Sequence, residues 1–368
     1  MLISDLKINN YRNLKNNKFI FNNEVNYIYG ENAQGKTNLL ESIWMFTGTR
    51  SFRGTKDVDL VNFNKDFAKL EANLFFENRE QNIKINFAES KRKIFLNDIP
   101  QSYPTDIIGK FRAVLFIPSH ISLVRDKPES RRKFIDAAIC QLKPSYTKTI
   151  VTYNRILKQR NALLKDISRE NIGLDILDIW NLKLAKTGAQ IIAERIKYLE
   201  QLESDASKIH SEVSNSKECL KVVYFTTLKE KSLKNESESK IEAYMISRLE
   251  ETTFSDIKRG FTSVGPHKDD LELFLQDKSL KLFGSQGQQR SAVLSLKLAE
   301  ASVLERNIGE SPVILLDDVM SELDEYRKSY VISKIKNRQT FITGCDKDLI
   351  KNFSNINVLH IKNGDLLS

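Results

Sequence analysis

The stretch Gly30-Glu31-Asn32-Ala33-Gln34-Gly35-Lys36-Thr37 contains the complete pattern G-x-x-x-x-G-K-[ST]. Residues 25–29 before it alternate apolar and polar side chains and predict a strand, and residues 37–46 carry apolar side chains at helical spacing. A glycine loop between a strand and a helix turns its N–H groups toward a phosphate, where the positive end of the helix also points. Lys36 can then reach the β- and γ-phosphates, and the Thr37 hydroxyl can bind Mg²⁺. A chance Lys-Thr pair after a glycine turn is the alternative, and it leaves this context unexplained.

A second acidic motif lies near the other end of the chain. Pro312-Val313-Ile314-Leu315-Leu316-Asp317-Asp318 predicts a buried strand that ends in two carboxylates. In such a place Asp317 would hold Mg²⁺, directly or through water, and Asp318 would orient or deprotonate an attacking water. The alternative is an acidic loop after a core strand. Ser321-Glu322-Leu323-Asp324 follows at the spacing of a loop that reaches a partner subunit.

The separation of these two motifs predicts the domain organisation. A compact nucleotide-binding domain must bring both chain ends together, so the sequence between them is an insertion. We expect an α/β head formed by residues 1–118 and 255–368, with a mainly helical lobe at 119–254. Two helices of about 30 residues would reach only about 45 Å, and no heptad pattern persists, so we expect a compact lobe and no long coiled coil. A single helix is expected at 321–336.

Composition limits the partners and the compartment. The 368 residues carry a net charge of +9 and a pI of about 9.2, which is compatible with nucleic acid as a partner. No apolar run has membrane-spanning length, and the first residues lack the pattern of a signal peptide. The three cysteines form no C-x-x-C pair, which favours a reducing compartment and no structural zinc. We therefore expect a cytoplasmic protein with no membrane partner.

A third motif precedes a predicted helix at residues 287–306. In Ser285-Gln286-Gly287-Gln288-Gln289-Arg290, a hydroxyl and a glycine stand at the start of that helix. They can form an anion site, or they can be an ordinary N-cap, and the segment alone does not decide between the two.

Taken together, the motifs resemble those of the ABC-type ATPases related to structural-maintenance-of-chromosomes (SMC) proteins. More narrowly, they resemble the RecF family of bacterial DNA replication and repair proteins. The resemblance is carried by residues 30–41, 265–270, 284–290 and 315–324, with similar short stretches at 11–14 and 131–136.

This resemblance implies an ATP- and Mg²⁺-dependent homodimer that binds duplex DNA or single-strand/duplex junctions. It implies that Ser285 belongs to a signature motif that meets the γ-phosphate held by a second subunit. It also implies a role with RecO and RecR in directing the RecA recombinase onto gapped DNA. Gln286 replaces the usual first glycine of the signature, and Thr343-Gly344-Cys345 stands where many relatives have a switch histidine. The second departure suits a slow ATPase that acts as a timer.

The expected site residues follow from these motifs. Asp318 and Lys36 are the catalytic candidates, and Thr37 and Asp317 are the metal candidates. The candidates for nucleotide contact are Arg12, Gly30, Glu31, Asn32, Ala33, Gln34, Gly35, Lys36, Thr37, Asn38, Ser285, Gly287, Gln288 and Asp324. The alternative for Arg12 is a surface arginine.

Other assignments stay open. His267 can lie near nucleotide or DNA, or make a structural hydrogen bond in a tight turn. The basic cluster at Arg125, Lys127, Arg131, Arg132 and Lys133 can contact phosphate or form a solvated face. The alternative functions are an armless chromosome-maintenance or nuclease-associated head, a transporter ATPase subunit, and a scaffold with an inactive ATP site.

Overall fold

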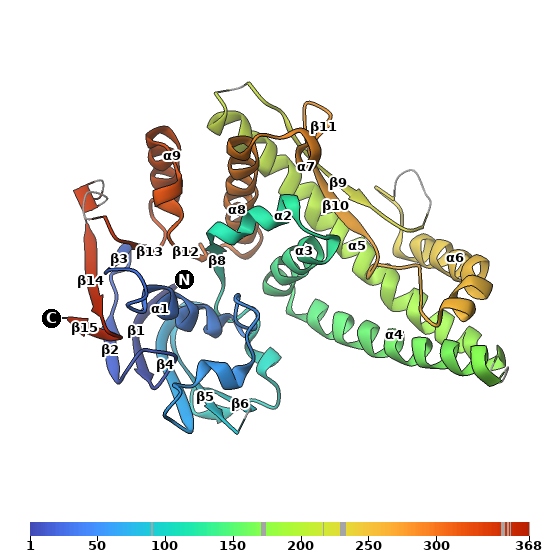
Figure 1. Cartoon of the computed structure of the whole chain (residues 1–368), viewed down its shortest axis with the longest axis horizontal. Coiled ribbons are helices and arrows are strands. Elements are labelled where there is room, and N and C mark those ends of the chain that lie inside the picture. The colour runs from blue at the N-terminus through green and yellow to red at the C-terminus, as the bar shows by residue number, and fades with distance from the viewer. Residues whose placement is uncertain are drawn as a thin grey trace. The chain divides into compact units, whose positions relative to one another are not determined.

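The computed structural model describes residues 1–89, 91–170, 174–215, 217–228, 233–346, 350–351, 353 and 355–367 (Figure 1). These residues form two compact units, one from residues 1–120 and 297–368 and the other from residues 121–296. Among the described residues, none of the helices is both long enough and apolar enough to span a bilayer.

A six-stranded, mostly parallel sheet forms the centre of the first unit, in the order β15-β14-β3-β13-β12-β8. Its strands come from both chain ends, as the blue β3 beside the orange-red β13 and β14 shows (Figure 1). Their bounds are β3 Val25–Tyr29, β8 Ala113–Phe116, β12 Val313–Leu316, β13 Thr340–Gly344, β14 Ile356–Lys362 and β15 Asp365–Leu367. β8 and β12 are wholly buried apolar runs, and β13 is buried except at its last residue, as expected of parallel strands.

An antiparallel sheet forms the second layer of this unit, in the order β2-β1-β4-β5-β6-β7. Its strands are β1 Leu2–Asn9, β2 Asn17–Ile20, β4 Phe67–Phe76, β5 Arg79–Ala88, β6 Lys91–Leu96 and β7 Ile99–Pro100. Alternate residues of β4 and β5 are buried, and they pack with α1 (Lys36–Trp44) and the parallel sheet in one apolar core. Asn97 and Asp98 both have positive φ, 49° and 65°, and form the turn between β6 and β7.

The remaining short elements of the first unit connect these layers. They are the 3₁₀ turns η1 Met45–Thr47, η2 Asp57–Leu60, η3 Pro104–Ile107, η4 Pro118–Ile121 and η5 Val319–Glu322, and the helix α9 Glu325–Ile335. The expected single helix over 321–336 is confirmed only from Glu325 onward, and its predicted start was wrong. Asp324 has extended backbone and caps α9 by accepting from the backbone N–H of Arg327 at 2.9 Å, so η5 and α9 are separate.

The second unit is mainly helical, as predicted for the inserted lobe. Its helices are α2 Ser122–Arg125, α3 Pro128–Leu142, α4 Pro144–Glu170, α5 Leu174–Val213, α6 Glu238–Arg259, α7 Leu280–Phe283 and the first part of α8, Gln286–Ile308. The long helix α5 packs along its length against α4, α6 and β9 rather than leaving the unit as an arm. The prediction of an α/β head with a helical lobe is confirmed, and the described residues form no long coiled coil.

Buried charges hold the helices of this unit together. Arg160 is fully buried and donates to Asn181 at 2.8 Å, Asp256 at 3.1 Å and Thr262 at 2.7 Å. Arg195 is buried and binds both carboxylate oxygens of Asp136. Removing one partner of such a pair would leave a buried charge uncompensated.

The second unit extends further along the sequence than residue 254. The strands β9 (Leu220–Phe225) and β10 (Asp270–Leu275) pair antiparallel over six residues, with β11 (Lys278–Ser279) on the outer side of β10. Residues 255–296, which the sequence suggested as head, therefore group with the lobe by contact. The cause is a pairing between strands some 45 residues apart, which periodicity along the chain does not reveal.

Two glycines with nearly the same positive φ allow a matched test of packing in the first unit. Gly364 has φ 78° and Gly309 has φ 79°, but a Cβ on Gly364 would lie 1.9 Å from Asn13 O, whereas nothing lies within 4 Å of one on Gly309. In both alanine variants the left-handed backbone lowers the free energy of unfolding by about 1 kcal/mol. We expect Gly364→Ala to lower the free energy of unfolding by a further 1–3 kcal/mol, roughly the cost of overpacking. Urea denaturation measures both, and equal losses would contradict the steric argument.

Candidate functional site

The phosphate loop connects β3 to α1 and is held by the C-terminal hairpin. Gly35 has φ 116°, which only glycine adopts readily, and it precedes the first residue of α1. A Cβ on Gly30 would lie 2.4 Å from Ile361 O on β14. Gln34 accepts from the N–H of Asn363 at 2.6 Å and from that of Gly364 at 3.1 Å. Residues at opposite ends of the chain therefore fix the shape of the loop.

Lys36 lies inside the curled loop. Its side chain is buried, and Nζ donates to Gly30 O at 2.7 Å and to Glu31 O at 3.0 Å. Nζ is also 3.0 Å from Cys345 Sγ, just after β13. The positive charge of Lys36 therefore lies where the loop N–H groups and the N-terminus of α1 also favour the binding of an anion.

Thr37 and Asp317 meet across the parallel sheet. The hydroxyl of Thr37 donates to Asp317 Oδ1 at 2.9 Å, and Thr343 on β13 donates to the same oxygen at 2.9 Å. β3, β12 and β13 are parallel, so their carboxyl ends deliver these residues to one edge of the sheet. Burial raises the pKa of Asp317, an effect opposed by the hydrogen bonds from Thr343 and Thr37.

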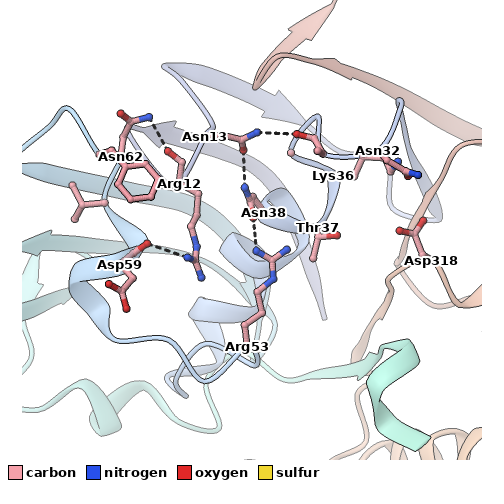
Figure 2. Close-up of a pocket in the computed structure, with 14 residues that line it drawn as sticks. Arg12, Asn13, Asn32, Lys36, Thr37, Asn38, Arg53, Asp59, Asn62 and Asp318 are labelled. Carbon is pink, nitrogen blue, oxygen red and sulfur yellow. Dashed lines mark hydrogen bonds between the residues drawn. The ribbon is translucent and has the colours of Figure 1, made fainter.

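Asp318 follows in an unusual backbone conformation. Its φ is 52°, and its N–H donates to the Thr343 hydroxyl at 2.9 Å. It is half-buried and lines the same cavity as Lys36 and Thr37 (Figure 2). A left-handed residue here turns the second carboxylate away from the strand and toward the loop.

This donor set fits a magnesium nucleotide. The Thr37 hydroxyl and the Asp317 carboxylate are oxygen ligands of the kind Mg²⁺ prefers, and they already face each other. Lys36 and the loop N–H groups would hold the phosphates.

The cavity beside the loop has a volume of about 440 Å³ and extends to the segment 53–63. Arg12, a predicted nucleotide contact, lines this cavity, but its guanidinium is already engaged. It binds both oxygens of the fully buried Glu41 at 3.0 Å, together with Asp59 O at 3.0 Å and the Thr55 hydroxyl at 2.8 Å. The structure therefore places Arg12 as a brace between α1 and the outer wall.

Arg53 is a site residue that the sequence analysis missed. It is exposed, lines the cavity and donates to Asn38 Oδ1 at 2.7 Å, while Asn38 donates to Asn13 at 2.6 Å (Figure 2). These polar contacts hold the guanidinium of Arg53, a second positive charge after that of Lys36, toward the start of α1. The arginine lies outside every recognisable motif, so only its position in the folded chain reveals it. Thr343 and Cys345 were noted as a departure from the usual switch histidine, not as contacts of Asp317 and Lys36.

The signature residues belong to the second unit, where they begin α8 (Figure 1). Ser285 Oγ accepts from the backbone N–H of Gln288 at 3.2 Å, and Gln288 Oε1 accepts from that of Ser285 at 2.8 Å. This reciprocal pair is a capping box. Ser285, Gln286 and Gly287 are all exposed, so the ordinary N-cap is present on a surface that can still meet an anion.

The structure accounts for several residues whose roles the sequence left open. His267 is largely buried, with Nδ1 2.7 Å from the Tyr153 hydroxyl and Nε2 3.1 Å from Thr262 O, and burial lowers its pKa to about 4. This is the structural hydrogen bond of a tight turn. In the basic cluster, the buried Arg131 binds Asp270, and Arg125 binds Gln289 at 2.7 Å. Asp324 caps α9 and pairs with Arg327.

Known proteins resemble the chain over its whole length. The model of the RecF/RecN/SMC N terminal domain matches residues 2–365. The DNA replication and repair protein RecF of Acetivibrio thermocellus is 39% identical over 353 residues, or 96% of this chain and 95% of that protein. The protein of the same name from Ruminiclostridium cellulolyticum is 38% identical over 372 residues, covering 100% of both.

Solved structures agree. The recombination mediator protein RecF-ATP of the RecFOR pathway superposes with a TM-score of 0.92 at 37% identity, covering 100% of this chain and 97% of that one. An Smc head bound to the C-winged helix domain of ScpA gives a TM-score of 0.57 at 14% identity, over 100% of this chain and 98% of that one. The second likeness shows a shared fold only.

The raised pKa of Asp317 predicts a pH dependence of metal binding. Protonated Asp317 is a poor ligand, so the tightening of ATP binding by Mg²⁺ should begin to fall at a higher pH than for an ordinary aspartate. Titrating ATP with Mg²⁺ or with EDTA between about pH 4 and pH 7 separates this effect from titration of the nucleotide. Asp317→Asn should abolish the Mg²⁺-dependent part, and an unchanged pH profile in that variant would contradict the assignment.

Proposed function

The chain belongs to the RecF family of DNA replication and repair proteins, and from this premise we propose that it is an ATP-operated DNA clamp. Two protomers pair head to tail when each presents Ser285 to the phosphates held by Lys36 and Thr37 of the other. The paired form binds duplex or gapped DNA and, with RecO and RecR, helps to load RecA. Slow hydrolysis then separates the protomers and releases the DNA.

One observation carries the proposal more than any other. Thr37 and Asp317 meet within hydrogen-bond distance although 280 residues separate them, so the chain assembles the phosphate loop and the acidic strand end into one Mg²⁺-nucleotide site. Asp318 lines the same cavity and is the group proposed to orient or deprotonate water. Intact residues at all of these positions argue against a scaffold with an inactive site.

The surface around the signature motif supports pairing between copies of the chain. Leu282 and Phe283 are separated from Ser285 only by Gly284, and they expose 74% and 71% of their surface. Apolar side chains beside an exposed polar motif are typical of the centre of a protein interface. An ATP-bound partner would cover these two side chains. Because the paired form would bind ATP better than the free protomer, ATP would shift the equilibrium toward pairing.

DNA binding is proposed from family membership together with the net charge of +9. Since paired protomers would form or align the DNA surface, ATP and DNA must raise each other's affinity by the same factor. The hydrolysis is proposed to be slow because Cys345, rather than a histidine, follows β13 beside Lys36.

Nucleotide binding and pairing can be separated by two variants. Lys36→Ala removes the buried ammonium, so we expect ATP affinity to fall at least tenfold, about the loss of one charged contact. Ser285→Arg places a bulky cation at an exposed position, so ATP binding should persist while pairing is lost. Light scattering with and without ATP measures pairing, and Ser168→Arg on the exposed face of α4 is the control. A wild-type protein that stays monomeric with ATP would sink the proposal.

Asp318→Asn should trap the clamp in its closed form. Asparagine has the size of aspartate and tolerates the left-handed backbone at φ 52°, so the fold should be retained. Loss of the general base would leave ATP binding intact and slow phosphate release by roughly 10²–10⁴-fold. In gel shifts with single-stranded, duplex and gapped DNA, this variant should hold duplex or gapped DNA longer than the wild type. Complexes that decay equally fast with ATP would argue against hydrolysis as the release step.

A further inference from the structure

A buried histidine and a glutamate lie behind the signature motif. Glu218 Oε2 is 3.0 Å from Nε2 of the fully buried His210, while Glu218 Oε1 accepts from Gln288 Nε2 at 2.7 Å. The other ring nitrogen of His210 is 3.3 Å from the Ser295 hydroxyl on α8. One carboxylate therefore joins α5 to the first turn of the signature helix.

The Glu218 carboxylate accepts on both sides. A carboxylate oxygen only accepts, so Nε2 of His210 donates to Glu218 Oε2, whichever charge state the imidazole has. Ser295 Oγ donates to Ser291 O at 2.8 Å and lies 3.3 Å from Nδ1 of His210. Glu218 is thus held between a ring nitrogen of α5 and the amide of Gln288.

The Glu218 carboxylate fixes the orientation of the Gln288 amide. Because the carboxylate only accepts, Gln288 must turn Nε2 toward Glu218 and Oε1 toward the Ser285 N–H. The backbone N–H of Gln288 in turn donates to Ser285 Oγ. Since Oγ is the acceptor in the capping box, its own proton stays available to donate away from the helix.

We propose that Glu218 is a positioning residue for the signature serine: it orients Gln288 so that Ser285 presents a hydroxyl donor to the phosphates held by a second protomer. The inference rests on the proposed function, in which Ser285 completes the partner's site. It assigns Glu218 no contact with nucleotide. Its effect should therefore appear in pairing and not in the first binding of ATP.

Two substitutions at Glu218 separate positioning from general structure. Glu218→Ala frees the amide, so the dissociation constant of the dimer in saturating ATP should rise at least tenfold, about the loss of one charged hydrogen bond. Glu218→Gln can offer Oε1 to Gln288 and an N–H to neutral His210, so pairing should stay within about threefold of the wild type. ATP affinity, measured on dilute monomer, should change less than about twofold in both.

Matched controls make the result decisive. Glu129→Ala removes another carboxylate of the same unit, one whose side chain is 66% exposed in an ion pair with Lys133, and should have no effect. Gln288→Glu places two carboxylates against each other and leaves His210 unchanged, so this variant should also lose pairing. It therefore tests the inference even if Glu218→Ala fails to fold. The wild type must pair with ATP, and Ser285→Arg must not, for the proposed function to hold. If both conditions are met and Glu218→Ala still pairs normally, the inference alone is overturned.

A mixture of two variants tests whether Glu218 acts across the interface. In a dimer of Glu218→Ala with Lys36→Ala, one site joins the intact Lys36 of the first protomer to the intact signature of the second. Phosphate release should therefore recover in the mixture, although each variant alone is defective. No recovery would mean that the Glu218 change damages the phosphate loop of its own chain, which would overturn the inference.

Discussion

The first unit depends on the convergence of two hydroxyls on one carboxylate oxygen of Asp317. Thr37 is the second residue of α1, Thr343 lies one residue before the end of β13 and Asp317 directly follows β12. This junction therefore exists only when three segments from both chain ends pair correctly. A buried carboxylate without those donors would pay a large desolvation cost. The same requirement explains the position of the insertion. The chain leaves the parallel sheet after β8, an edge strand, where added sequence does not interrupt the order β3-β13-β12.

Local features of the fold could be predicted from the sequence, and features that depend on distant pairing could not. The glycine pattern, the strand before it and the helix after it are encoded within about twenty residues, and the acidic strand is a continuous apolar run. Residues 255–296 were assigned to the head, but they group with the lobe. The sequence of β10 is that of an ordinary amphipathic strand, and it does not indicate that β10 pairs with β9. The helix expected at 321–336 was wrong at its start because Asp324 was interpreted as a functional acid, not as a cap.

The site shows the same division. Lys36, Thr37, Asp317 and Asp318 were identified because their spacing follows from what a phosphate and a cation require. Arg53 and Thr343 were not, since their roles follow from the cavity wall and the neighbouring strand, and no motif marks them. Arg12 shows the limit of analogy. The residue lines the cavity as expected, yet Glu41 holds its guanidinium, so its first effect is to fix the wall that carries Asp59.

The two proposed halves of the ATP site differ in what they must give up. Lys36 donates to two loop carbonyls, so phosphate binding exchanges existing hydrogen bonds for stronger, charge-assisted ones, and the net gain is smaller than the gross attraction. Ser285 uses only its acceptor capacity in the capping box, so its donor meets a phosphate without breaking any contact within its own helix. In the proposed dimer, binding to the loop would therefore come first and cost some rearrangement, whereas closure by the second protomer would add contacts that are already oriented. Preorganisation of this second half, through Gln288 and the charge on Glu218, would let a small exposed motif shift the equilibrium between free and paired protomers.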